Sequence, residues 1–315
     1  MPAPVCLIVN PAAGGGRAAR VAPVAERALR THGLTLRRSD TRDLDHAREL
    51  AAEAVALGET VVVLGGDGLI GAVADHLRTL PGALLGVIPG GRGNDLARVV
   101  GIPNDADAAA AIIAAGHARP LDLGLVQELR LDGGEPTPGR AFVGIASAGF
   151  DSDANRIANE APAWLGQLVY AYGALRALLF WRSARFELEL DPPGERRVYH
   201  GFSIGACNSK AYGGGMLAAP DALLDDGLLE VVLCEHMSKL AFLTRILPKI
   251  FKGTHIHEPG VHVFRARELE LAADRPFTMY ADGDPIGQLP VRVRALPAAV
   301  MLLTPAAGGS AFSES

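Results

Sequence analysis

The first hundred residues alternate short apolar runs with longer segments in which apolar residues recur at helical spacing. Strand-like runs lie at 5–10, 60–66 and 84–91, and each leads into glycine or proline. Helical spacing predicts helices over 17–31, 44–57, 69–80 and 95–100. A more polar run at 34–41 predicts an edge strand. This alternation predicts a mostly parallel sheet covered by helices, whose ligands bind beyond the carboxyl ends of the strands.

The pattern changes after about residue 120, where strand-like runs separated by turns predominate. Helices are predicted there only at about 153–181 and 238–252. We therefore predict an α/β domain followed by a β-rich domain, a sandwich of antiparallel sheets. The predicted bounds are 1–120 for the α/β domain, 121–297 for the sandwich and 307–315 for a disordered tail. The last strand-like run, at 298–306, is a candidate to return to the first domain.

Composition and charge exclude several classes of protein. The chain has 315 residues and a formal net charge of −5, which argues against nucleic acid as a partner. Only four of its 30 basic residues are lysines, and none lies in a GxxxxGKS/T loop, so a Walker-type NTPase is excluded. Residues 1–10 have no signal-peptide pattern, and the apolar run around 165–181 is too interrupted to span a bilayer. We expect a cytoplasmic protein.

Glycine clusters follow three of the predicted strands and open helices, at 10–20, 65–68 and 89–95. Glycine lets the backbone turn tightly and bring its N–H groups onto an anion, while the helix N-terminus adds positive potential. A purely structural turn explains any one cluster, but three in one α/β domain favour phosphate binding. A dinucleotide fingerprint is met only in its permissive form, with Ala19 in place of the third glycine. It gives the GGDG loop no role, so a hydride-transfer oxidoreductase is the weaker alternative.

Six motifs, taken in order, resemble the diacylglycerol kinase catalytic family, which includes bacterial soluble lipid kinases and the sphingosine and ceramide kinases. The motifs are NPAAGGGR, GGDG, PGGRGNDLAR, LDLG, APDALLDDGLLEV and ADGDP. The resemblance covers about residues 5–305. It implies a nucleotide-binding α/β domain followed by a β-sandwich, with the active site in the cleft between them. It also implies transfer of the γ-phosphate of ATP, with Mg²⁺, to a hydroxyl of a lipid.

The resemblance assigns roles to individual residues as well. The nucleotide would be contacted by Asn10, Thr41, Gly65, Gly66, Asp67, Gly68, Leu69, Arg92 and Asn94. Asp67 and Asp122 would organise the catalytic Mg²⁺, directly or through water, because phosphoryl transfer depends on positioning and charge neutralisation. Asp284 would accept the proton of the attacking hydroxyl. The simpler explanation of Asp284 is an aspartate in a hairpin turn.

The resemblance implies a second, structural Mg²⁺ in the LDDG segment. Asp226 would bind this ion together with the backbone carbonyls of Leu223 and Leu228. Magnesium prefers oxygen ligands and keeps several waters, so few protein ligands are needed. The simpler explanation is that Asp226 only begins a turn before a strand.

The chain departs from the family pattern beside the glycine clusters. The family usually has a hydroxyl residue after GGDG and an Asn-Glu pair two residues on, where this chain has Leu69, Gly71 and Ala72. Arg92 takes the place of a threonine, and Asp284 takes the place of a glutamate. Two interpretations follow. Either Arg92 supplies charge to the phosphates in place of lost hydroxyls, or the site has decayed into that of a binding protein.

Two amphipathic segments are candidates for contact with lipid. The segment 165–181 is rich in aromatic residues, which line a lipid site, touch a membrane or pack in the core. The segment 238–255 is mildly basic, which suits contact with anionic lipid. We expect a kinase acting on diacylglycerol or a related amphiphile, with peripheral contact at the inner membrane face. A kinase for a polar metabolite, a non-catalytic binding protein and a homodimer remain open alternatives.

Overall fold

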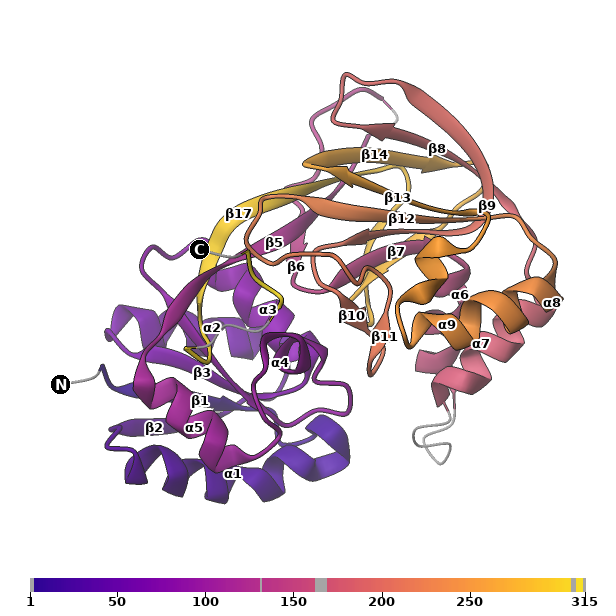
Figure 1. Ribbon diagram of the computed structural model, residues 1–315. Coiled ribbons are helices and arrows are strands. Elements are labelled where there is room, and N and C mark those ends of the chain that lie inside the picture. The colour runs from indigo at the N-terminus through magenta and orange to yellow at the C-terminus, as the bar shows by residue number, and fades with distance from the viewer. Residues whose placement is uncertain (1–2, 131, 162–168, 307–309, 314–315) are drawn as a thin grey trace.

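Figure 1 shows the protein as a computed structural model, which describes residues 3–130, 132–161, 169–306 and 310–313. A helix-covered sheet forms the first part of the molecule, and a β-rich part with helices at one end forms the second. The elements of the first part are β1 (Val5–Val9), α1 (Ala13–Thr31), β2 (Leu36–Asp40), α2 (Leu44–Ala56), β3 (Thr60–Gly65), α3 (Asp67–Leu77), β4 (Leu84–Pro89), α4 (Asp95–Val100) and α5 (Ala106–Ala115).

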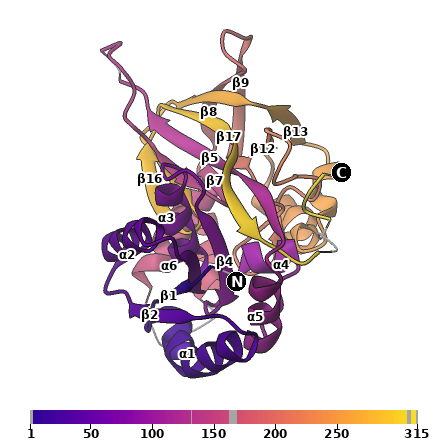
Figure 2. The same cartoon turned by 90° about the vertical axis from the view of Figure 1, so that its left-hand side faces the viewer.

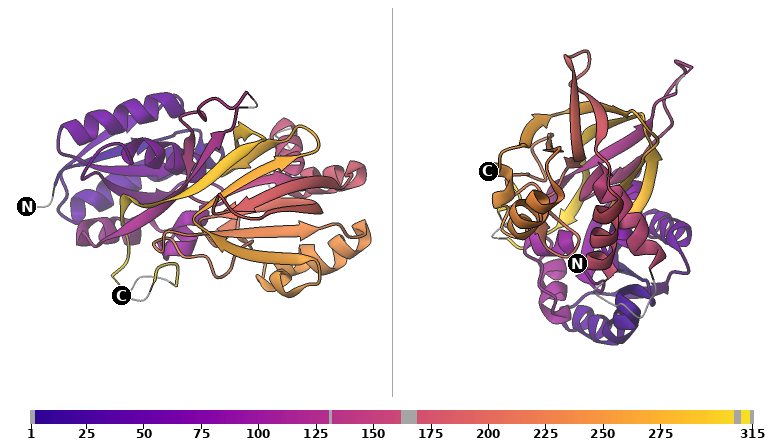
Figure 3. Two further views of the ribbon diagram at one scale, coloured as in Figure 1. Left: turned by 90° about the horizontal axis from the view of Figure 1, so that it is seen from above. Right: turned by 90° about the vertical axis from the view of Figure 1, so that its right-hand side faces the viewer.

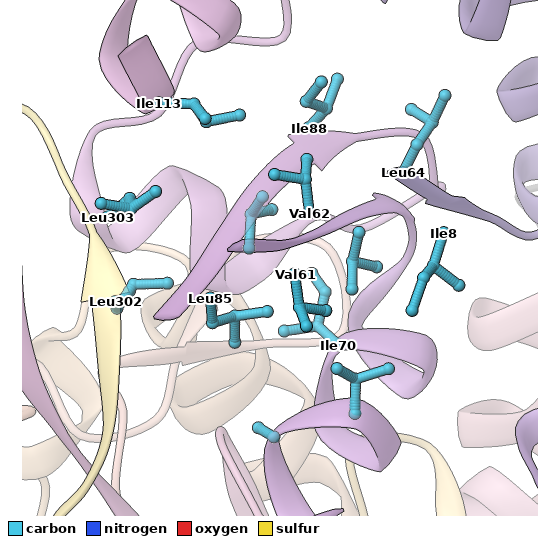
Figure 4. Packing of buried hydrophobic residues seen from close by; sticks show 14 of the residues in the cluster. Ile8, Val61, Val62, Leu64, Ile70, Leu85, Ile88, Ile113, Leu302 and Leu303 are labelled. Carbon is cyan, nitrogen blue, oxygen red and sulfur yellow. The ribbon is translucent and has the colours of Figure 1, made fainter. Parts of the chain in front are cut away.

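The sheet of the first part is parallel, with the strand order β2–β1–β3–β4. Every residue of β1 and β3 is buried, because helices cover both faces of these central strands. Helices α1 and α5 lie on one face, and α2 and α3 lie on the other (Figures 1 and 2). Figure 4 shows part of the resulting apolar core around Val61, Ile88 and Ile113. The more polar β2 is the edge strand, as predicted.

Two long strands connect the parts, β5 (Ala118–Glu128) and β17 (Val291–Leu303). They pair antiparallel along nearly their whole length and run from one part into the other (Figure 3). The end of β17 also pairs in parallel with β4, through Met301 and Leu302. The last strand of the chain therefore joins the first sheet, which is the return considered for 298–306.

The second part consists of antiparallel strands with helices at one end. Its elements are β6 (Arg140–Phe142), β7 (Ile145–Gly149), α6 (Phe150–Glu160), α7 (Val169–Phe180), β8 (Ala184–Leu190), β9 (Arg196–Cys207), β10 (Ala211–Tyr212), β11 (Met216–Leu217), β12 (Leu229–Glu235), α8 (Lys239–Ala241), the π-helix η2 (Phe242–Ile246), α9 (Leu247–Ile250), the 3₁₀-helix η3 (Thr254–His257), β13 (Val261–Ala266), β14 (Glu268–Ala273), β15 (Thr278–Ala281) and β16 (Asp284–Gln288). The long β9 pairs with β12 on one side and with β7 and β8 on the other. The predicted fold class, a mostly parallel α/β sheet followed by a β-sandwich, is confirmed.

The helices of the second part differ from the prediction in detail. The helix predicted at 153–181 is two helices, α6 and α7, which pack against each other, and 162–168 lie outside the described residues. The helix predicted at 238–252 is divided into α8, η2 and α9. A π-helix such as η2 is rare and often occurs at a functional site. Of the helices that the structure describes, none is both long and apolar enough to cross a membrane.

The end of the chain packs against the first part, contrary to the disordered tail predicted at 307–315. Ala311 and Phe312 are buried. The Arg119 guanidinium lies 4.5 Å from the centre of the Phe312 ring, a cation–π contact that helps to hold this segment. The prediction is therefore wrong for 310–313, while the other residues of the tail lie outside the described ones.

Asp122 ties β5 to two loops at the junction of the parts, and it is almost completely buried. Its Oδ1 accepts the Ala298 N–H at 2.7 Å, and its Oδ2 accepts the Gly227 N–H at 2.6 Å. The side-chain amide of Asn208 donates to the Asp122 carbonyl oxygen at 2.8 Å. Buried backbone donors need such partners, so Asp122 holds the junction together.

We expect Asp122→Asn to lower the free energy of unfolding by about 2 kcal/mol, because an amide cannot accept both backbone hydrogen bonds and leaves a buried N–H unpaired. Urea unfolding followed by circular dichroism measures this change. Asp132→Asn is the matched control, since Asp132 is exposed and pairs with Arg130 and Gly134 of its own turn. Its unfolding free energy should stay within about 0.5 kcal/mol of the parent. Equal losses in both variants would contradict the junction role of Asp122.

Candidate active site

A cavity of about 710 Å³ lies between the two parts of the molecule, where the cleft was predicted. The first part lines it with the start of α3 and with the loop that leads into α4. The second part lines it with α6, α7, η2, α9 and the turn between β15 and β16. One end carries the charged side chains of Asp67, Arg92, Asp95 and Asp282. The volume suits a small-molecule ligand, for which sites of about 300–1,000 Å³ are typical.

Asp67 and Asp95 bring two carboxylates to this polar end. Asp67 is the first residue of α3 and Asp95 the first of α4, and each helix follows a strand of the parallel sheet. A methyl group built on Gly93 would lie 3.1 Å from Oδ2 of each aspartate, so the two oxygens face one small space. The Leu96 N–H donates to Oδ1 of Asp67 at 3.2 Å, and the Gly214 N–H donates to Oδ2 of Asp95 at 2.8 Å. Backbone donors from both parts therefore fix the pair.

This carboxylate pair is the candidate site for a partly hydrated Mg²⁺ ion, and Oδ1 of Asp95 also forms an ion pair with Arg98. Burial raises the pKa of Asp95, and the negative charge of Asp67 adds to the rise, although the Gly214 N–H and Arg98 oppose it. A cation between the two carboxylates would relieve their repulsion. Among the described residues, no three acidic, His or Cys side chains form a complete metal cage. Mg²⁺ needs only one or two carboxylates when it keeps waters and binds substrate phosphates.

The sequence analysis gave Asp67 a role in this site, whereas Asp95 was part of the matched motif PGGRGNDLAR but received no role. The signal for Asp95 was present, because it follows Asn94 directly and is the first acid of a predicted helix after a glycine cluster. Acids at that position point toward the same sheet edge as the GGDG loop.

The three glycine clusters lie against one another. A methyl group on Gly91 would lie 2.4 Å from Cα of Gly66, and one on Gly14 would lie 2.6 Å from the carbonyl oxygen of Gly90. Side chains at these positions would push the loops apart. Close packing of the loops is therefore a structural reason for these glycines.

Asn10, Thr41 and Asn94 lie in the loops that follow strands of the parallel sheet. Oδ1 of Asn10 accepts a backbone N–H two residues on at 3.1 Å, and the Thr41 hydroxyl donates to the carbonyl oxygen of Asp43 at 2.6 Å. The buried side chain of Asn94 accepts the Gly91 N–H at 2.8 Å and donates to the Gly91 carbonyl at 3.2 Å. These side chains shape the loops, and their contact with nucleotide stays a prediction.

Leu69 and Arg92 have very different surroundings. Leu69 is buried in the core of the first part, where a methyl group on Gly65 would clash with it. The Leu69 side chain packs between helix and sheet, so only the backbone of this residue is left for the predicted nucleotide contact, which stays a prediction. Arg92 is exposed and is the one cationic side chain among the described residues that line the cavity. It stands among carboxylates, where a polyanionic substrate would otherwise be repelled.

The β15–β16 hairpin brings Asp284 to the first part of the molecule. Oδ2 of Asp284 would lie 3.2 Å from a methyl group on Gly68, so it lies beside the GGDG loop. Burial raises the pKa of Asp284, and the positive charge of Arg140 opposes the rise. Asp284 lines a separate small depression rather than the cavity. The structure thus brings Asp284 to the GGDG loop but not to the cavity.

Asp282 is the acid of this hairpin that lines the cavity, and the sequence analysis missed it. Its Oδ2 accepts the Val143 N–H at 2.9 Å, and its Oδ1 accepts the Gly144 and Ile145 N–H groups at 2.9 and 3.3 Å. Burial raises the pKa of Asp282 to about 7, and the charge of Asp67 adds to the rise, while the backbone donors oppose it. A carboxylate has about four lone-pair sites, so Oδ2 keeps one for a ligand.

The turn itself contained the signal for Asp282. An Asp-Gly pair between two strands predicts a two-residue type I′ turn, in which both residues have positive φ. Asp282 and Gly283 have φ values of 52° and 93°. The family resemblance selected Asp284, the second acid of ADGDP, whereas the geometry of the turn points to Asp282, the first.

Both carboxylate oxygens of Asp226 have partners in the structure. One oxygen forms an ion pair with Arg265, and the other accepts the Leu228 N–H at 3.0 Å. Arg265 thus supplies positive charge to Asp226, as Arg98 does to Asp95. A structural Mg²⁺ held by Asp226, Leu223 and Leu228 stays a prediction.

Asp122 lies at the junction of the two parts and does not line the cavity. Its role near the catalytic Mg²⁺, directly or through water, stays a prediction.

The remaining lining of the cavity is largely apolar and comes from the second part. The apolar side chains of α7 and of 242–251 that line it are Ala174, Leu175, Leu178, Phe242, Leu243, Ile246, Leu247, Ile250 and Phe251. One acid, Asp151, lies among them; burial raises its pKa to about 6, and a hydrogen bond with Ser203 opposes the rise. Hydrocarbon placed here would gain about 0.8 kcal/mol per buried methylene group. The cavity therefore suits a ligand with a polar end and an apolar tail.

Comparison with known proteins covers both parts of the chain. Residues 4–126 match the diacylglycerol kinase catalytic domain, and residues 144–304 match the YegS C-terminal NAD kinase beta sandwich-like domain. The diacylglycerol kinase of Mycobacterium tuberculosis is 35% identical over 309 residues, which cover 96% of each chain. A protein of Serratia proteamaculans named "Probable lipid kinase YegS-like" is 31% identical over 309 residues, which cover 95% of this chain and 93% of that one.

A solved structure agrees with the fold. The crystal structure of a diacylglycerol kinase from Bacillus anthracis superposes with a TM-score of 0.72 at 19% identity, over 96% of this chain and 97% of that one. The relatives that match over nearly the whole chain bear the names of kinases, which are phosphotransferases. The chain therefore belongs to the family of diacylglycerol kinases and YegS-like lipid kinases, the family that its six motifs resemble.

Proposed function

We propose that the protein transfers the γ-phosphate of ATP to a hydroxyl of diacylglycerol or a related amphiphile. The observation that carries this proposal is the cavity, in which an apolar compartment adjoins the carboxylates of Asp67, Asp95 and Asp282. A polar metabolite would leave the apolar side chains of α7 and 242–251 without a partner. The names of the relatives at 35% and 31% identity support a lipid as the acceptor class.

The phosphates of ATP are proposed to lie over the glycine clusters, at the carboxyl ends of the parallel strands. The helix N-termini that follow these clusters and the guanidinium of Arg92 offer positive charge there. Bound Mg²⁺ supplies further neutralisation of the phosphate charge. Asp67 and Asp95 hold their carboxylates toward one space before any ligand arrives, and this preorganisation is what phosphoryl transfer requires.

The acceptor hydroxyl is proposed to lie where the apolar compartment meets the carboxylates. Its oxygen forms a bond to the γ-phosphorus while the bond to the β,γ-bridging oxygen breaks and ADP leaves. Its proton passes to Asp282, which lines the cavity and keeps one lone pair on Oδ2. Three backbone donors hold this carboxylate in place, and a raised pKa makes it a better base near neutral pH than an ordinary aspartate.

Asp67→Asn should lower turnover on the order of a thousandfold, because it removes a charge that positions the transferred phosphate and its metal. The assay follows transfer of labelled phosphate from ATP to diacylglycerol in mixed micelles, and Asp132→Asn is the control. Full turnover by the Asp67 variant would contradict its role. If the parent protein forms no product with any of a broad panel of lipids, this result would contradict the lipid-kinase proposal. It would favour a non-catalytic binding protein instead.

The two acids of the hairpin make a matched pair for the proton-transfer step. We expect Asp282→Asn to lower kcat by about 10²–10⁴-fold with little change in the KM for ATP, and Asp284→Asn to lower kcat less than about tenfold. Because Asp282 also holds the turn before β7, the melting temperature of each variant is measured alongside. A folded Asp282 variant with normal kcat, beside an inactive Asp284 variant, would return the role to Asp284.

A further inference from the structure

Six exposed apolar side chains gather where α7 meets α8, η2 and α9. This group, the apolar rim, consists of Leu175, Leu179, Phe180, Leu240, Leu243 and Phe251, which are 37–77% exposed. Figures 1 and 3 show the two groups of helices side by side at the end of the second part. The other large apolar side chains that are exposed among the described residues lie on different elements, so this gathering is local.

The helices that carry the apolar rim have apolar side chains on both their inner and their outer faces. Their inner face is anchored in the sandwich core through Ala177, Leu178, Phe242 and Ile246. The outer face of a surface helix normally carries polar side chains, whereas here it also carries leucine and phenylalanine. The Lys239 ammonium donates to the carbonyl oxygen of residue 179 at 2.7 Å and ties the end of α7 to the start of α8. This hydrogen bond brings together the two groups of helices that carry the rim.

The apolar rim continues into the cavity. Leu175, Leu243 and Phe251 are exposed and also line the cavity. An apolar path therefore runs from the outer surface toward the carboxylates at the polar end. A hydrocarbon chain could follow this path from a membrane without being exposed to water.

Basic residues surround the apolar rim. The segments 169–182 and 238–252 contain six basic residues and no acidic one, although the whole chain has a net charge of −5. The six are Arg176, Arg182, Lys239, Arg245, Lys249 and Lys252, which include three of the four lysines of the chain. All six are exposed. Positive charge around an apolar patch complements an anionic lipid surface.

We propose that the apolar rim and its surrounding basic residues dock the protein on an anionic lipid bilayer, with the mouth of the cavity facing the hydrocarbon. The proposal rests on the proposed function, since it supplies the route by which a lipid acceptor enters. The rim side chains enter the boundary between head groups and acyl chains, and the basic side chains remain at the level of the lipid phosphates.

Vesicle sedimentation without ATP or acceptor tests the docking directly. The full chain should bind vesicles of phosphatidylcholine with phosphatidylglycerol at least about tenfold more tightly than vesicles of phosphatidylcholine alone, and added salt should weaken binding. Two double variants, Leu179→Ser with Phe180→Ser and Arg245→Glu with Lys252→Glu, should each lose about tenfold in binding. None of these four residues lines the cavity.

Matched controls change other exposed residues, which lie away from the rim. Leu57→Ser with Val198→Ser removes two exposed apolar side chains, and Arg27→Glu with Arg267→Glu reverses two exposed charges. Both control variants should bind vesicles as the parent does. Parent-like binding by the rim variants, or no binding by the parent, would overturn the proposal. The parent could instead form a dimer, lose that dimer when the rim residues are changed, and bind no vesicles. This result would overturn the docking proposal and show that the rim mediates self-association.

Turnover assays separate this proposal from the proposed function. With a short-chain diacylglycerol dissolved as monomers, the rim variants should keep the parent rate, and with long-chain diacylglycerol in anionic vesicles they should lose about tenfold. Equal rates in vesicles would overturn the docking proposal while the kinase function stands. A parent protein that binds vesicles through the rim but phosphorylates neither acceptor would overturn the kinase function while the docking stands.

Discussion

The antiparallel pairing of β5 with β17 is the constraint on which the candidate site depends. Both strands run from the first sheet into the sandwich, and the end of β17 also pairs with β4. Asp122 reinforces this connection with hydrogen bonds to two loops. The carboxylates of Asp67 and Asp95 come from the first part, and that of Asp282 comes from the second. Catalytic groups must be held to within about 0.5 Å, so a site divided in this way needs a rigid connection behind it.

The cavity held between the parts combines two environments that rarely occur together. At one end, burial raises the pKa of Asp95 and of Asp282, and the charge of Asp67 adds to both rises, which makes this end receptive to cations and protons. The other end is apolar and reaches the surface at the apolar rim. An amphiphile with a hydroxyl head satisfies both environments at once, whereas a polar metabolite satisfies only the first. This pairing accounts for the proposed acceptor and for the proposed docking on a bilayer.

The features that the sequence predicted are those that depend on neighbouring residues along the chain. The parallel strands, the glycine clusters after them and Asp67 at the start of a helix follow from local pattern. The surroundings of Asp226 and Leu69, in contrast, depend on partners that are distant along the chain. Asp226 is neutralised by Arg265 of another strand, and Leu69 is buried against Gly65 by the packing of α3 on the sheet. The two amphipathic segments were recognised separately, but only the tertiary structure shows that they share one cavity mouth.

Photolabelling tests the central claim, that the apolar compartment holds the acyl chains of the acceptor. A diacylglycerol analogue with a photoactivated diazirine at the end of one acyl chain is bound to the full chain, irradiated, and mapped by peptide mass spectrometry. The account predicts labels on α7 and on 242–251, around Leu178 and Ile246, which unlabelled diacylglycerol reduces by competition. Labels confined to the first part of the molecule, or labels that excess diacylglycerol does not reduce, would contradict it.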